Sequence, residues 1–168
     1  MNILKNLMLT LLLGPAAAAT SLANIGITVE IENNTSKALE MTNYLSERPI
    51  HPDYTMSDYG VPAKTSREFY FIYDRKFTYP TADWQPSLRK VKPTELVLSY
   101  QMSHFNFGCQ MQTRFEAPIG FGVLESRYRP DWTSRTAYTG NGEYTCRSQI
   151  TQKMLEPPFN YTVRLIVE

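Results

Sequence analysis

Few residues in this sequence could carry out acid–base or nucleophilic chemistry. Only two histidines occur, His51 and His104, and no GxSxG turn marks a serine nucleophile. His104 falls between two expected strands, which favours a half-buried structural role over that of a general base. His51 lies in a segment that is expected to be an exposed loop. An enzyme would have to assemble its site from residues far apart in the sequence, and we predict that the protein is not an enzyme.

Metal-binding chemistry is equally sparse. His51, Asp53 and Asp58 are close in sequence, but their spacing matches no recognised pattern of metal ligands. Glu30 and Glu32 share one face of an expected strand, with side chains roughly 7 Å apart, a separation used by some glycoside hydrolases. The apolar residues beside them take the other face, so we interpret the pair as solvated carboxylates. No metal or other cofactor is predicted.

The two cysteines, Cys109 and Cys146, are expected to form one structural disulfide, because no CxxC spacing indicates a redox site. Closing the loop between them would stabilise the fold by roughly 4 kcal/mol in the chain-entropy model.

Aromatic and basic side chains gather in three segments expected to be loops. Prolines in 46–65 and 75–93 forbid central strands there, and 126–135 repeats the mixture of arginine with aromatic residues. Loops of this length are usually functional or disordered, and their aromatic content argues against disorder. The residues that we predict to bind a ligand are Arg75, Lys76, Tyr79, Trp84, Arg89, Lys90, Tyr128 and Trp132.

These side chains suit a polar or anionic ligand at a surface. Tyrosine and tryptophan offer flat amphipathic area, and arginine offers bidentate contacts to phosphate, sulfate or carboxylate. A lipid headgroup, a glycan or a protein could fill that role. The alternative is that several rings only cover the open ends of the fold.

The elements that would position these loops are strands. In "FNFGCQMQTRFE", residues 105–116, apolar residues alternate strictly with polar ones, which is the period of a strand with one buried face. No stretch after residue 23 keeps an apolar stripe at helical spacing for three turns. We predict an all-β fold, a single β-sandwich of mainly antiparallel strands. The expected strands are 25–32, 37–45, 66–74, 95–103, 105–116, 119–126, 133–139, 142–152 and 159–167.

The first 23 residues read as a cleaved signal peptide, with Lys5, an apolar run and small residues at Ser21 and Ala23. This leaves 24–168 as one domain, without a transmembrane span, in a secreted or periplasmic location. Lys5 is the only charge removed, so the 145 remaining residues hold 16 basic and 16 acidic side chains. That balance argues against nucleic acid as a partner.

The succession "ITVEIENNTSKALEM" (27–41), "REFYFIY" (67–73) and "ELVLSYQM" (95–102) resembles the layout of exported β-sandwich lipid-binding proteins of the actinoporin and aegerolysin kind. The resemblance implies a sandwich fold and binding to a membrane surface. In the pore-forming members a membrane-inserting helix precedes the first strand. Here the first strand begins about one residue after the expected cleavage site, so pore formation by that route is not expected.

Together these features predict a small exported, non-catalytic binding protein that engages a lipid headgroup or glycan through its aromatic and basic loops. The alternative, from a different functional class, is an exported inhibitor or immunity protein that blocks a partner enzyme with one of these loops. A single disulfide-linked sandwich with rigid, proline-rich loops suits that role too.

Overall fold

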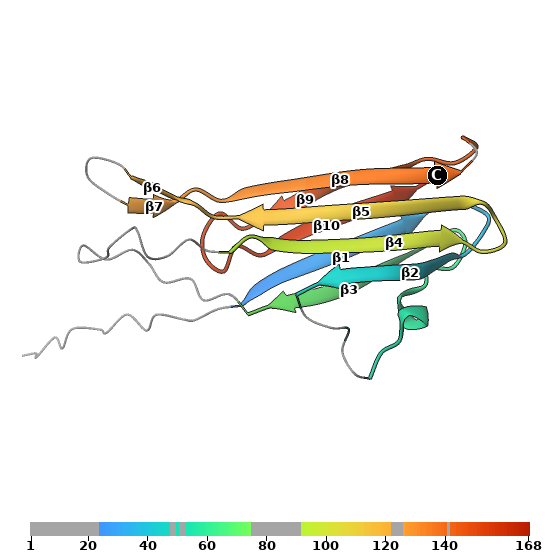
Figure 1. The fold of residues 1–168 in the computed structure, drawn as a ribbon, viewed down its shortest axis with the longest axis horizontal. Helices are drawn as coiled ribbons and strands as arrows, with labels where there is room; N and C mark the ends of the chain where they lie inside the picture. Colours follow the sequence, from blue (N-terminus) through green and yellow to red (C-terminus); the bar gives the residue numbers. More distant parts are fainter. Residues whose placement is uncertain (1–23, 48–49, 51–52, 75–91, 122–125, 141) are drawn as a thin grey trace, which may run out of the picture.

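A computed structural model describes residues 24–47, 50, 53–74, 92–121, 126–140 and 142–168. In this part of the chain, ten strands form two four-stranded sheets and one two-stranded ribbon (Figure 1). Sheet A has the order β3-β1-β10-β9, and sheet B has the order β2-β4-β5-β8. The strands are β1 (Ile25–Asn33), β2 (Leu39–Ser46), β3 (Thr65–Tyr73), β4 (Thr94–Met102), β5 (Phe107–Glu116), β6 (Ile119–Phe121), β7 (Ser126–Tyr128), β8 (Asp131–Gly140), β9 (Cys146–Lys153) and β10 (Tyr161–Val167).

The predicted all-β sandwich is confirmed. Each of the nine expected segments contains a strand, and the only helix among the described residues is the single turn η1 (Met56–Tyr59). The largest departure is at 119–126, where the short strands β6 and β7 pair with each other instead of continuing a main sheet. None of the described helices is long and apolar enough to cross a membrane. The expected signal peptide, 1–23, lies outside the described residues.

The first and last strands lie side by side at the centre of sheet A. β1 pairs with β10 in parallel, with Val29 opposite Val163 and Ile31 opposite Leu165, whereas the other pairings among the described strands are antiparallel. Both strands alternate apolar residues facing sheet B with mostly polar residues facing outward, Ile166 being an apolar exception on the outer face of β10. Matching the two alternations buries one face of each strand and leaves a polar outer face.

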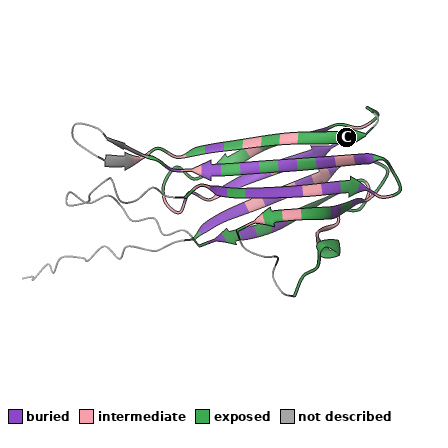
Figure 2. Cartoon of the chain, viewed as in Figure 1, coloured by how far each residue is buried: buried purple, intermediate pink, exposed green. Residues whose placement is uncertain are grey.

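The core lies between the two sheets. Figure 2 shows buried and more exposed residues alternating along several strands. β5 has the strictest alternation, since every second residue from Phe107 to Phe115 is buried, including the polar Thr113, while the residues between them face outward. This is the pattern expected of a strand with one face in a sandwich core.

The predicted disulfide is confirmed, and it joins the two sheets. The sulfur atoms of Cys109, on β5, and Cys146, on β9, are 2.24 Å apart. The link lies near the edge where β8 of sheet B approaches β9 of sheet A. A covalent bond at this position keeps the two layers together on that side.

A buried asparagine organises the turn after β1. Asn33 is fully buried, and its Nδ2 donates to the carbonyl oxygens of Lys37, Val61 and Pro62 at 2.8, 3.1 and 3.0 Å. Its Oδ1 accepts from the backbone N–H and the hydroxyl of Thr35. One side chain therefore ties the 34–38 turn to residues 61–62, which precede β3, and satisfies polar groups that would otherwise be buried without partners.

On the opposite side, aromatic rings fill the opening between the two sheets, where β2 lies near β3. Tyr44 stacks on Phe71 with centroids 5.8 Å apart, and Tyr59 packs on Phe69 at 4.9 Å. Tyr59 comes from η1, so this part of the 46–65 segment acts as a lid over the core. That is the covering role considered above for the aromatic loops.

Candidate functional site

Most of the predicted ligand-binding residues lie outside the described part of the chain. Arg75, Lys76, Tyr79, Trp84, Arg89 and Lys90 belong to 75–91. Tyr128 and Trp132 are described.

Trp132 is a core residue. It is 8% exposed, and its ring centroid lies 5.4 Å from that of Phe115. Tyr128 is half-buried and packs edge-on against Phe159 at 5.7 Å. Both rings close the end of the sandwich, and little of Trp132 is left for a ligand to touch. Ligand binding by Tyr128 stays a prediction.

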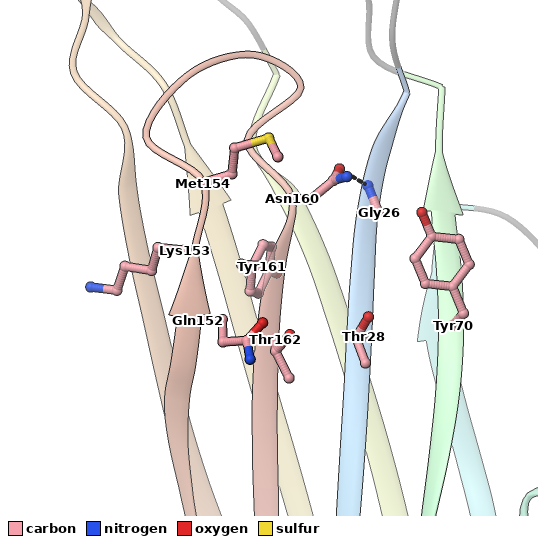
Figure 3. Close-up of a pocket in the computed structure, with 9 residues that line it drawn as sticks. All are labelled: Gly26, Thr28, Tyr70, Gln152, Lys153, Met154, Asn160, Tyr161 and Thr162. Atoms are coloured by element: carbon pink, nitrogen blue, oxygen red, sulfur yellow. Dashed lines mark hydrogen bonds between the residues drawn. The ribbon is translucent and has the colours of Figure 1, made fainter.

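The structure instead shows a hollow on the outer face of sheet A, near the end where β1 begins (Figure 3). Its volume is about 460 Å³. Each of the four strands of the sheet, together with the β9–β10 turn, contributes side chains. The lining residues are Gly26, Thr28, Tyr70, Gln152, Lys153, Met154, Asn160, Tyr161 and Thr162.

Gly26 creates the floor of this hollow. A Cβ at position 26 would lie 2.1 Å from the hydroxyl oxygen of Tyr70. Tyr70 faces Thr28 across the β1–β3 ladder, so its ring leans diagonally over the glycine. The ring is nevertheless 59% exposed. Glycine at position 26 therefore leaves room for the Tyr70 ring, whose exposed part borders the hollow.

Asn160 fixes the opposite wall. The backbone N–H of Gly26 donates to Asn160 Oδ1 at 2.7 Å, which links the start of β1 to the β9–β10 turn. This bond orients the amide, and Nδ2 has no hydrogen-bond partner among the described residues. The Nδ2 group is thus a positioned donor that is available to a ligand.

A bulge in β9 adds to the polar lining. Thr162 faces Gln152, whereas the next residue, Val163, faces Ile150, so Thr151 is the extra residue. A bulge of this kind changes the direction in which the side chains on one strand point. The side chains of Thr28 and Gln152 make no hydrogen bond within the described part of the chain.

The chemistry of the hollow is polar and nearly neutral. Hydroxyl, amide and phenol groups line it, and Lys153 is the one charged side chain among the lining residues. The Lys153 ammonium lies 5.4 Å from the centre of the Trp132 ring. The Tyr161 phenol points away from the hollow into the core, where it accepts from Thr113 Oγ1, and burial raises its pKa, with that hydrogen bond acting in the opposite direction.

The residues weighed above for catalysis are placed elsewhere. Glu30 accepts from Arg164 Nε at 2.7 Å, and Glu32 accepts from Asn34 at 2.9 Å. His104 lies in the β4–β5 turn and is exposed, so the expected half-buried position is wrong. No group of three metal-ligating side chains occurs among the described residues.

Neither the models of known protein families nor the curated proteins contain a significant match to this chain.

Sequence reasoning missed this hollow because its residues are distant in the chain. Gly26 and Asn160 are separated by 134 positions, and neither belongs to a recognisable motif. The one sequence feature that pointed to the hollow was Gly26, a glycine at an outward-facing position of β1. A glycine inside a strand often marks a close approach of another group.

Proposed function

We propose that the protein is an exported, non-catalytic binding protein whose ligand is a neutral glycan, held in the sheet A hollow. The observation that carries the proposal is the open Tyr70 ring beside the side-chain-free Gly26, opposite the positioned amide of Asn160. An aromatic face and planar amide groups match the two kinds of surface on a sugar, its C–H face and its hydroxyl groups.

A neutral ligand fits better than an anionic headgroup. Only Lys153 among the lining residues is cationic, and its ammonium lies over an aromatic ring. Recognition of a phosphate or sulfate group typically uses arginine forks or several backbone N–H groups, which the lining lacks. Glycan recognition depends on hydroxyl and amide hydrogen bonds together with ring contact, and these groups are present.

Exposed apolar side chains border the hollow. Ile72 follows Tyr70 on the outer face of β3, and Met154 and Leu155 project from the β9–β10 turn with 45% and 71% of their surfaces exposed. Such residues suit a ligand that is presented on a surface instead of one free in solution. This supports the surface role expected from the sequence, with the contact moved to sheet A.

The test is binding of the purified domain, residues 24–168, to an array of immobilised neutral and acidic glycans. We expect neutral glycans to bind, and Tyr70→Ala to weaken that binding about tenfold through loss of ring contact. Tyr138→Ala is the matched control, because Tyr138 is 54% exposed on sheet B, away from the hollow. Equal binding by the wild type and Tyr70→Ala would contradict the proposal, and a tight protein partner would favour the inhibitor alternative.

A further inference from the structure

The free edge of β3 differs from the other outer edges of the two sheets. β8 and β9 approach each other beside the disulfide, and β2 forms a bridge with the flanking chain through Leu39 and Val61. β3 hydrogen-bonds only to β1 among the described strands. Near the start of β3, Arg67 donates to the carbonyl oxygen of Gly60. In the described structure, residues 68–72 make no such hydrogen bond to the chain that precedes β3.

The second half of this edge strand has the composition of a pairing segment. Residues 69–73 read Phe-Tyr-Phe-Ile-Tyr, without charge, proline or glycine. Such runs readily add a further strand, and natural edge strands usually interrupt them with charges or bulges. Here Tyr70 and Ile72 are 59% and 45% exposed on the outer face. The pairing with β1 is regular, without a bulge.

We propose that this edge binds a second copy of the same chain, with the two β3 strands antiparallel about a two-fold axis. A two-fold axis perpendicular to the sheet keeps outer residues beside outer residues and core-facing residues beside core-facing residues. Tyr70 of one copy then faces Tyr70 of the other, and Phe69 faces Phe71 of the second copy. The partner is a second copy because the strand is complementary to itself in this arrangement.

Charge placement selects this register. Centring the pair on Phe71 would set Glu68 opposite Asp74 of the second copy, and like charges directly opposite each other destabilise a ladder. Centring it on Phe69 would set Ile72 opposite Ser66 and expose more apolar surface. Centring on Tyr70 sets Glu68 opposite Ile72 of the second copy and keeps the two carboxylates from facing each other.

The dimer would continue sheet A across eight strands, four from each copy. Because outer faces stay together, both hollows would open on the same side. This consequence rests on the proposed function: the dimer brings two glycan sites to one surface. Two sites raise its avidity for a glycan-bearing surface without any new contact. One strand pair buries less area than a standard interface, so the expected dissociation constant lies in the range of about 10 µM to 1 mM.

The first test is sedimentation velocity of the domain across this concentration range, without glycan. We expect the wild type to shift from monomer to dimer. Ile72→Glu sets a second carboxylate opposite Glu68 of the second copy in this register, and we expect it to remain monomeric. The control Tyr138→Glu should dimerise as the wild type does. A wild type that stays monomeric throughout would overturn the proposal.

The second test uses a cysteine at the axis. The two native cysteines are bonded to each other, so Tyr70→Cys introduces the only free thiol. Residues directly opposite in an antiparallel pair have Cα atoms about 4.5 to 5.5 Å apart, within the range that a disulfide spans. We expect mild oxidation to yield a covalent dimer from Tyr70→Cys and little from the control Tyr138→Cys. Equal yields from the two variants would contradict the register.

Discussion

Gly26 is the residue on which the proposed site depends most. Its missing side chain leaves room for the Tyr70 ring, which an added Cβ would meet at 2.1 Å. We predict that Gly26→Ala pushes the ring aside and weakens glycan binding by about tenfold. The melting temperature should change little, because the atoms in conflict belong to the free end of an exposed side chain and alanine suits a strand better than glycine.

Gly142→Ala is the control for this prediction, since a Cβ there meets nothing within 4 Å. Binding titrations and thermal melts on both variants check the prediction. Unchanged glycan affinity in Gly26→Ala would show that the Tyr70 ring position does not matter for binding.

Asn33 is a second single residue with a large expected effect, in this case on stability. Asn33→Ala removes three donated and two accepted hydrogen bonds at a fully buried position. We expect a loss of about 3 kcal/mol in the free energy of unfolding, because buried carbonyl groups lose their donors. Denaturant unfolding measures this loss. Asn34→Ala, one residue on and exposed, should change stability by less than about 0.5 kcal/mol.

At the scale of elements, η1 is held by one carboxylate. Asp58 accepts from the backbone N–H and the hydroxyl of Thr55 at 2.7 and 2.8 Å, and these bonds lower its pKa below the ordinary 3.8. A lowered pKa in the folded state means that the contribution is complete above pH 3.8 and is lost as the pH falls through the folded value. We predict that the η1 segment opens in that acidic window.

Hydrogen exchange of residues 53–61 as a function of pH tests this prediction. Asp58→Asn should show the faster exchange already at neutral pH, because it lacks the charge that strengthens both bonds. Protection factors of these amides, corrected for the intrinsic pH dependence of exchange, that stay unchanged as the pH falls from neutral to well below 3.8 would contradict it.

The strands could be predicted from the sequence because their period is local. The alternation predicts the inward position of Cys109, although β5 begins at Phe107, two residues later than expected, and similar patterns locate β1, β4 and β10. The parallel pairing of β1 with β10 could not be predicted, since strand order depends on contacts between distant segments. The site was missed for the same reason, because its walls come from both ends of the chain.

For the whole molecule, the disulfide and the hollow lie at opposite ends of β9. Cys146 begins that strand and Lys153 ends it. Replacing both cysteines with alanine should lower the free energy of unfolding by roughly 4 kcal/mol, because the unfolded chain regains loop entropy. Glycan binding by the remaining folded fraction should be unchanged.

Chemical denaturation and a binding titration on the double alanine variant check the two parts of this prediction separately. The single variants are less informative, because each leaves a free thiol. A double variant that is as stable as the wild type would show that the packing of the sheets already supplies what the disulfide adds.

The central claim is that a neutral glycan binds in the sheet A hollow, and amide chemical-shift mapping tests it most directly. The isotope-labelled domain is titrated with the glycan that binds best on the array. We predict the largest shifts at Gly26, at the Asn160 side-chain amide and at Gln152. Shifts confined to residues 75–91 or to the outer face of sheet B, with those three signals unmoved, would contradict the account.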